Sequence, residues 1–187
     1  MARHLLTRRL DDRPEVVVEV GSGTGLAGLA AAAVGACRVV LTDRPHVVPR
    51  LQQAIERNRA AIDGAEVVAA ALEWGDARAT HTAAPVGADL VLAADVLYSG
   101  DPAVHTALRR TLASLGAPRD ATILHAYEER WPQIVRQWRE GLEADGLRLV
   151  AERELECPPQ LAGRRLVLEE LRLTDERLFS TPGEEAS

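Results

Sequence analysis

Residues 15–28, with the sequence EVVVEVGSGTGLAG, constrain this chain more than any other segment, because a β-branched run leads directly into closely spaced glycines. Valine-rich runs favour buried strands, and glycines let the backbone turn tightly where a side chain would clash. The small apolar residues of 26–34 then favour a helix. A strand, a glycine turn and a helix in this order predict the start of a βαβ unit.

Further apolar runs alternate with helical patterns along the chain. We expect strands at 38–41, 66–70, 89–93, 121–126, 147–152 and 165–173, and helices near 47–62, 102–115 and 131–144, with 73–86 irregular. This alternation is typical of a parallel sheet, whereas two final strands without an intervening helix predict a hairpin. The expected fold is α/β, a Rossmann-like, doubly wound, mostly parallel seven-stranded sheet with an antiparallel C-terminal edge hairpin. Residues 1–179 would form the domain and 180–187 a flexible tail.

Composition excludes several classes of protein. The 187 residues suit one domain, at about 100–200 residues per domain. The formal charge of −6 argues against a nucleic-acid partner, and the lack of long apolar runs argues against a membrane span. Cys37 and Cys157 lack the spacing of a metal or disulfide site, so we expect no metal. A reducing location is predicted, in the cytoplasm or alternatively the nucleus.

The glycine turn by itself leaves two cofactor classes open. Gly23, Gly25 and Gly28 spell the GxGxxG pattern of dinucleotide-binding proteins. Glycines after the first strand of such a sheet are equally suited to other nucleoside cofactors, because ligands bind beyond the carboxyl ends of the strands.

The acids beside the turn favour S-adenosylmethionine. Glu19 lies two residues before Gly21, where a carboxylate would repel a pyrophosphate but would attract the ammonium of S-adenosylmethionine. Asp43 follows the second strand, where a carboxylate accepts hydrogen bonds from ribose hydroxyls in either class. The alternative is that the glycines only make a tight turn and the acids are solvated.

Three aromatic residues are expected at the carboxyl ends of the third, fourth and fifth strands: Trp74, Tyr98 and Tyr127. They either line a pocket that stacks an adenine or holds an amine, or they plug the end of the sheet. Trp131 and Trp138, seven residues apart, are predicted to pack in the core or against the sheet. His125 is interpreted as a structural strand residue rather than a base.

The segments VVVEVGSGTGLAG, VLTDRP, LEWGD, DLVLAADVLY and HAYEER, taken in order, resemble the seven-β-strand methyltransferases of methyltransferase family 16, which are protein-lysine methyltransferases. The resemblance covers residues 5–130. The DVLY sequence and the tryptophan of LEWGD are its most specific parts. It implies a protein substrate with an acceptor lysine, and S-adenosyl-L-methionine as the cofactor.

The resemblance also implies roles for single residues. The cofactor-binding residues would be Glu19, Gly21, Ser22, Gly23, Thr24, Gly25, Asp43, Trp74 and Ala94. Of these, Glu19 would lie near the ammonium, Asp43 would bind the ribose and Trp74 would lie against the adenine. Asp95 and Tyr98 match an acid-x-x-aromatic motif at the acceptor amine and are the candidate catalytic residues. Asp95 would orient the amine, and the alternative is that it caps the strand end.

Two other functions stay open at this stage. A small-molecule amine methyltransferase would use the same fold and cofactor. A truncated, non-catalytic cofactor-binding member is the second alternative, because related proteins usually have a longer segment before the first strand than the 14 residues that precede Glu15 here. An enzyme that methylates nucleic acid is disfavoured, because DVLY stands where an NPPY-like motif is expected. The sequence sets no oligomeric state.

Overall fold

The computed structural model describes residues 14–157, 159 and 162–174. The strands are β1 (Val16–Val20), β2 (Arg38–Asp43), β3 (Glu66–Ala71), β4 (Leu90–Ala94), β5 (Thr122–Glu128), β6 (Leu147–Leu155) and β7 (Leu166–Leu173). The α-helices are α2 (Leu26–Ala33), α3 (Val48–Arg57), α4 (Ala77–Ala83), α5 (Pro102–Gly116) and α6 (Pro132–Glu140). The predicted tail, 180–187, lies outside the described residues, as do 1–13.

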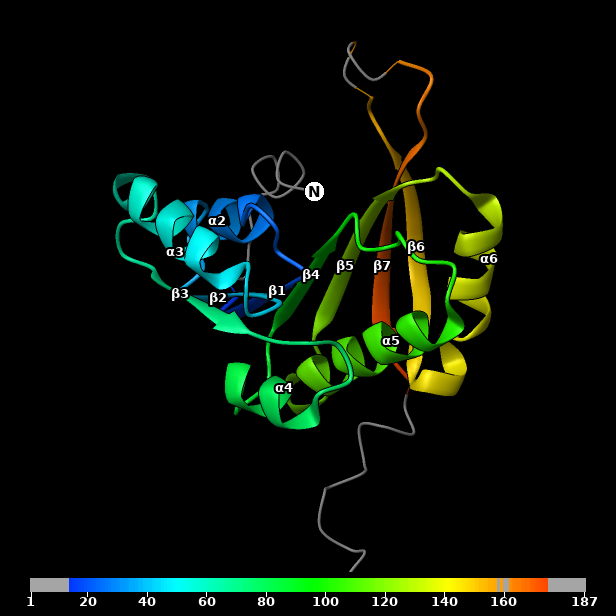
Figure 1. The fold of residues 1–187 in the computed structure, drawn as a ribbon, viewed down its shortest axis with the longest axis horizontal. Coiled ribbons are helices and arrows are strands. Elements are labelled where there is room, and N and C mark those ends of the chain that lie inside the picture. Colours follow the sequence, from blue (N-terminus) through cyan, green and yellow to red (C-terminus); the bar gives the residue numbers. More distant parts are fainter. Residues whose placement is uncertain (1–13, 158, 160–161, 175–187) are drawn as a thin grey trace, which may run out of the picture.

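The strands form one sheet in the order β3-β2-β1-β4-β5-β7-β6 (Figure 1). The pairs from β3 to β5 are all parallel, whereas β7 is antiparallel to both β5 and β6. The predicted α/β sheet with an antiparallel edge hairpin is confirmed. Strand order reverses between β1 and β4, the place where ligands bind in open α/β sheets.

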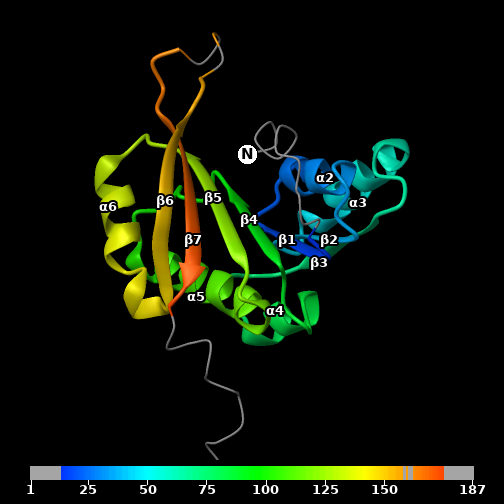
Figure 2. The same ribbon diagram turned by 180° about the vertical axis from the view of Figure 1, so that it is seen from behind.

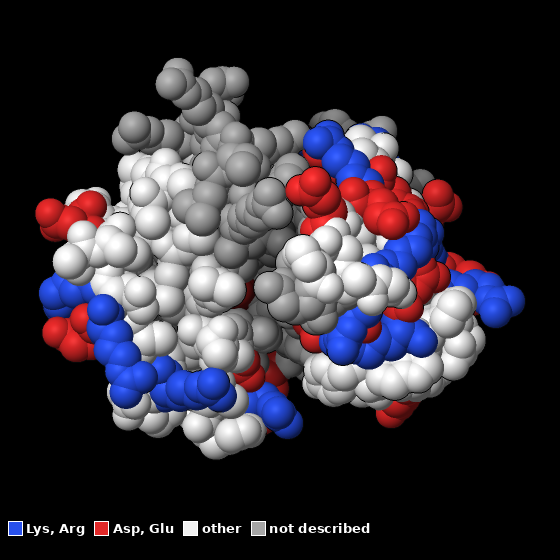
Figure 3. Space-filling view, turned by 90° about the horizontal axis from the view of Figure 1, so that it is seen from above, with Lys and Arg blue, Asp and Glu red and all other residues white. Residues whose placement is uncertain are grey.

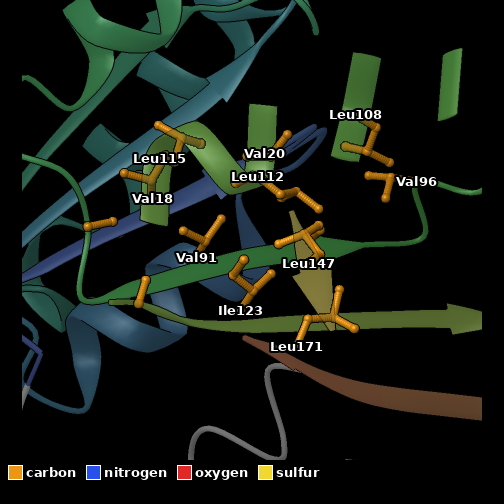
Figure 4. Packing of buried hydrophobic residues seen from close by; sticks show 14 of the residues in the cluster. Val18, Val20, Val91, Val96, Leu108, Leu112, Leu115, Ile123, Leu147 and Leu171 are labelled. Atoms are coloured by element: carbon orange, nitrogen blue, oxygen red, sulfur yellow. The ribbon is translucent and has the colours of Figure 1, made fainter. Parts of the chain in front are cut away.

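Helices cover both faces of the sheet, giving three layers (Figures 1 and 2). The helices α4, α5 and α6 pack on one apolar cluster, part of which Figure 4 shows, and α2 and α3 pack on the other. The valines of β1 alternate between the faces, with Val18 in the first cluster and Val17 in the second. No helix in the described ranges is long and apolar enough to cross a bilayer.

The first helix packs very closely on the sheet. A Cβ atom at Gly28 would lie 2.3 Å from Leu41 Cδ2 and 2.9 Å from Glu19 Oε2, both closer than atoms can approach. Glycine at this position therefore lets α2 lie directly against β1 and β2.

The parallel register brings the strand ends to one edge. Val20 of β1 pairs with Thr42 of β2 and with Ala93 of β4, and Ala94 pairs with Ala126 of β5. The segments that leave β1, β2, β4 and β5 at their carboxyl ends therefore lie side by side. At the same end, the β6–β7 hairpin rises above the sheet (Figure 1).

The expectation of irregular structure at 73–86 is wrong, because α4 forms there. Asp76 caps this helix by accepting a hydrogen bond from the Ala79 amide at 2.9 Å. Thr80 and Ala83 are buried against the neighbouring elements. The threonines and histidine in ARATHTA weaken the local helical preference, so tertiary packing supplies much of the stability of this short helix.

The prediction for the two late tryptophans is half right. Trp138 is fully buried on α6, whereas Trp131 is 44% exposed. Trp131 is the residue before Pro132 and precedes the first turn of the helix, so the seven-residue spacing does not place both rings on one helical face.

A buried carboxylate joins β5, β7 and α6. Glu169 accepts hydrogen bonds from His125 Nδ1 (3.0 Å), the Tyr127 hydroxyl (3.0 Å), Trp138 Nε1 (3.1 Å) and Arg139 Nε (2.7 Å). His125 is thus a structural strand residue, as expected. Burial raises the pKa of Glu169, but the hydrogen bonds and charges of His125 and Arg139 outweigh it and hold the pKa at about 2.

Replacing Glu169→Gln should lower the free energy of unfolding at pH 7 by about 3 kcal/mol, because a buried ion pair is broken on one side. The stabilisation by Glu169 is present above its unfolded pKa of 4.5 and is lost as the pH falls towards 2. Urea unfolding from pH 7 down to pH 3 measures both effects. Glu170→Gln, at a partly exposed neighbouring position, should change the stability by less than about 0.5 kcal/mol. Equal losses in the two variants would contradict the assignment.

Candidate functional site

The glycine turn after β1 has a backbone shape that requires glycine. Gly21, Gly23 and Gly25 all have positive φ, at 64°, 54° and 76°. A Cβ at Gly21 would lie 2.9 Å from Val96 Cγ1, whereas one at Gly23 would meet nothing within 4 Å. The turn therefore packs on Val96 at Gly21 and faces open space at Gly23.

Two further contacts fix the turn to its neighbours. The Ser22 amide donates to the Thr42 carbonyl at 2.9 Å, and the Ser22 hydroxyl donates to the Glu19 carbonyl at 3.1 Å. The Gly25 amide donates to the Ser22 carbonyl at 2.7 Å, which closes the turn before α2 begins. The turn is thus held by β1, by β2 and by its own backbone.

Glu19 is a buried acid beneath the turn. Its side chain lies between β1 and α2, and only 2% of the residue is exposed. Its Oε2 accepts a hydrogen bond from the Gly28 amide at 3.0 Å. Burial raises the pKa of Glu19 to about 7, against the lowering effect of hydrogen bonds from Gly28 and Ser22. Its charge therefore responds to pH, and to any cation that binds beside it, near neutrality.

Asp43 ends β2 with both carboxylate oxygens held by backbone. The Gly23 amide donates to Oδ2 at 2.8 Å and the Arg44 amide donates to Oδ1 at 2.7 Å. Each oxygen keeps a further lone pair that a hydroxyl donor can use. The carboxylate is therefore fixed in place before any ligand binds.

Two cavities open at this edge of the sheet. The tryptophan cavity has a volume of about 350 Å³ and is lined by Gly21, Asp43, Arg44, Leu72, Glu73, Trp74, Asp95, Val96, Tyr98, Val104 and Ala107. The arginine cavity, of about 750 Å³, is lined by Glu19, Gly21, Ser22, Gly23, Thr24, Leu26, Ala27, Ala94, Asp95, Ala126, Tyr127, Glu128, Arg130, Leu155, Arg164, Leu166 and Val167. Gly21 and Asp95 line both, so the two cavities meet at these residues.

The tryptophan cavity carries two aromatic rings. Trp74 and Tyr98 lie 5.8 Å apart between ring centroids and are tilted by 38°. Trp74 is half-buried, whereas Tyr98 is 58% exposed, so Tyr98 lies at the mouth. Tyr127 lies on the other side, where its ring is buried and its hydroxyl binds Glu169. The predicted aromatic rim is thus split between two cavities.

Asp95 stands where the cavities meet, with an unusual backbone. It has a φ of 56°, and among the described residues only Asp120 also combines positive φ with a side chain. Its amide donates to the Ala126 carbonyl at 2.7 Å, which anchors it to β5. Non-glycine residues in this region cost about 1–3 kcal/mol and gather at functional sites.

Sequence reasoning brought most of the site together and missed one part. The nine predicted cofactor residues all lie at the turn or the cavities, but Gly25 lines neither cavity, and a Cβ at this position would lie 2.9 Å from Leu41 Cδ1. The missed part is Arg130, which donates from both terminal nitrogens to the two oxygens of Asp95 at 3.0 Å. The signal was present in HAYEER, where an arginine follows β5 directly. No cluster of three metal-ligating side chains occurs in the part of the chain that the structure describes.

Gly21→Ala should destabilise the protein by about 1–3 kcal/mol, because a side chain would be strained at this φ and would press on Val96. Thermal unfolding measures the loss, and Trp74 fluorescence reports the local shift, since the new Cβ would lie 3.3 Å from its ring. Gly100→Ala is the control, because nothing lies within 4 Å of a Cβ there. If both variants are equally mild, the turn tolerates a side chain and the reasoning is wrong.

Comparison with known proteins agrees with this geometry. A structure of magnesium protoporphyrin IX methyltransferase from Synechocystis PCC 6803 with bound SAM superposes with a TM-score of 0.67 at 17% identity, covering 92% of this chain and 78% of that one. Because the identity is low, the likeness shows the fold alone.

Sequence relatives are more informative. EEF1A lysine methyltransferase 3 of Xenopus tropicalis is 32% identical over 117 residues, which cover 63% of this chain and 49% of that protein. Protein N-lysine methyltransferase METTL21A of Mus musculus is 36% identical over 107 residues, covering 57% and 47%. The chain thus spans about half the length of these curated relatives. The family model described as lysine methyltransferase matches residues 4–141, most of the chain. By that match, the chain belongs to the lysine methyltransferase family.

Proposed function

We propose that the protein transfers a methyl group from S-adenosylmethionine to a lysine side chain of another protein. The observation that carries the proposal is the meeting of the two cavities at Gly21 and Asp95. One cavity then takes a nucleoside, and the meeting point is where a methyl donor and an amine would come into contact. The family match and the names of the two relatives support lysine as the acceptor.

The residues at the site fit this cofactor. Gly23 leaves open space beside the turn, so backbone can approach a ligand closely. Glu19 is a buried acid that suits an ammonium group, and Asp43 is held ready to accept hydrogen bonds from ribose hydroxyls. Trp74 offers a ring in the same cavity as Asp43, where an adenine can stack. The Glu19 carboxylate beneath the turn would repel a pyrophosphate, which disfavours a dinucleotide.

When bound, the cofactor supplies a methyl group activated on a sulfonium. The chain's own part is alignment, because an in-line displacement depends on the position and direction of the nucleophile. Ala94 and Asp95 lie at the end of β4, on the arginine cavity, next to the turn. Their short connection to β5, through the Asp95 amide and the Ala126 carbonyl, makes that edge rigid.

The acceptor amine must be oriented, and it must release a proton to the solvent before its lone pair can attack the methyl group. A lysine in water has a pKa near 10.4, so most of it is protonated and cannot attack. Asp95 is 54% exposed at its side chain and can accept a hydrogen bond from the amine, which directs the nitrogen. Tyr98, at the mouth of the same cavity, can pack on the aliphatic stem of the lysine.

Calorimetry should detect binding of S-adenosylhomocysteine and none of NADH, because the Glu19 carboxylate beneath the turn suits an ammonium and repels a pyrophosphate. Labelled methyl groups from S-adenosylmethionine should enter lysines of proteins in a lysate, and small amines should compete poorly. Asp95→Asn should reduce transfer with little change in cofactor affinity, since the residue is placed on the acceptor. Binding of NADH alone would exclude the proposed cofactor. Transfer to small amines alone would favour the small-molecule alternative.

The affinity for S-adenosylhomocysteine should rise roughly tenfold between about pH 6 and pH 8, because the ammonium binds the ionised form of Glu19. The sign follows from the raised pKa of about 7, since an acid that is half protonated near neutrality must lose its proton to pair with a cation. Calorimetry at several pH values measures the slope. Glu19→Gln should remove the pH dependence, and an unchanged slope in that variant would assign it to another group.

A further inference from the structure

Asp95 is already paired with an arginine before an acceptor amine arrives. The two terminal nitrogens of Arg130 donate to Oδ1 and Oδ2, each at 3.0 Å. A planar guanidinium that meets a carboxylate at both oxygens is the strongest common form of this pair. The hydrogen bond and charge of Asp95 also raise the pKa of Arg130. A lysine that reaches Asp95 must therefore replace Arg130 or share the carboxylate with it.

Arg130 belongs to a chain of alternating charges along the arginine cavity. Its Nε donates to Glu128 Oε2 at 3.0 Å, and Arg164 of the hairpin donates to the same oxygen at 3.1 Å. The order Asp95, Arg130, Glu128, Arg164 balances two acids with two bases. Figure 3, which views the molecule from above, shows acidic and basic side chains interleaved over one half of the visible surface.

An exchange at Asp95 would unbalance this chain. A lysine ammonium on Asp95 would leave Arg130 with Glu128 as its acidic partner, and Glu128 is already shared with Arg164. Two guanidinium groups would then face one carboxylate, beside a cationic cofactor. Arg130 is 34% exposed at its side chain, so its two terminal nitrogens can turn towards a ligand. A carboxylate brought by the acceptor would restore both the hydrogen bonds and the balance.

We propose that Arg130 selects the acceptor, so that a lysine reaches Asp95 readily only when an acidic residue beside it in the substrate protein takes over the Arg130 guanidinium. This inference rests on the proposed lysine-directed function and adds the sequence context of the target. Arg130 is then a specificity-determining residue, and its exchange of partners accompanies acceptor binding.

General electrostatics predicts the opposite preference. The chain carries a formal charge of −6, so its overall field attracts cationic peptides and repels anionic ones. At about 0.15 M salt the screening length is ~8 Å, and close pairs outweigh distant charges. A preference for an acidic peptide is therefore diagnostic of a local contact such as the one with Arg130.

The test compares two peptides, Ac-Glu-Lys-Glu-NH2 and Ac-Gln-Lys-Gln-NH2, in NMR titrations of the protein loaded with S-adenosylhomocysteine. The acidic peptide should bind about fivefold more tightly, a difference equivalent to ~1 kcal/mol, the upper range for a partly exposed ion pair. Arg130→Gln should abolish the difference in affinity. The lysine of the glutamine peptide then no longer competes with Arg130 for Asp95, and the glutamates of the acidic peptide no longer have a guanidinium to bind. Arg130→Lys, which keeps the charge but not the fork, should give an intermediate value.

The control is Arg165→Gln, which removes the same charge from the hairpin at a residue that pairs with Glu129 and Glu152 and does not line the arginine cavity. The preference for the acidic peptide should persist in this variant. Equal binding of the two peptides by the unaltered protein, or a preference that survives Arg130→Gln, would overturn the inference. Thermal unfolding confirms that each variant is folded. Titrations repeated without S-adenosylhomocysteine separate a failure at Arg130 from a failure to bind the cofactor.

Discussion

The hydrogen bond between the Glu19 carboxylate and the Gly28 amide holds together the part of the molecule on which the site depends. It joins β1 to α2 at 3.0 Å, at a point where any side chain at residue 28 would collide with Leu41. The close packing of α2 on β1 fixes where the helix begins. The glycine turn that connects β1 to α2 is therefore held at both of its ends. A buried acid is expensive in such a place, and its raised pKa reflects that cost. This unfavourable burial of a carboxylate occurs at the position where the proposed cofactor would place a positive charge.

Asp95, which also lines the arginine cavity, lies in a different environment from Glu19. Asp95 has a strained backbone, is exposed and is paired with Arg130, whereas Glu19 lies on a regular strand, is buried and has a raised pKa. The first arrangement suits a group that exchanges partners, because an exposed ion pair contributes little to stability and is easily replaced. The second suits a group that holds one partner, because few competing ions reach it. Glu19 is thus suited to hold a single bound partner, and Asp95 is suited to exchange one partner for another.

The succession of strands along the chain, the edge hairpin and the clustering of Glu19, Asp43, Trp74 and Asp95 could be predicted, since each follows from local patterns and from the shared edge of parallel strands. What could not be predicted depends on pairs far apart in sequence. Arg130 and Asp95 are 35 residues apart, and His125 and Glu169 are 44 apart. A local sequence pattern does not reveal such pairs, because they depend on which strands lie beside β5 in the folded sheet. The helix α4 was missed for a related reason, since its local preference is weak and its burial supplies the remainder.

The choice of arginine over lysine at every basic position bears on whether the proposed reaction could modify the chain itself. The 187 residues contain no lysine, so every cation along the arginine cavity, Arg130 included, is an arginine. Groups tethered beside a reactive centre meet it at very high effective concentration, and a lysine in the place of Arg130 would be the first acceptor the centre encountered. With arginine there, the residue that pairs with Asp95 is not an acceptor for the proposed lysine-directed reaction. Within these 187 residues, the proposed lysine-directed reaction has no lysine to act on.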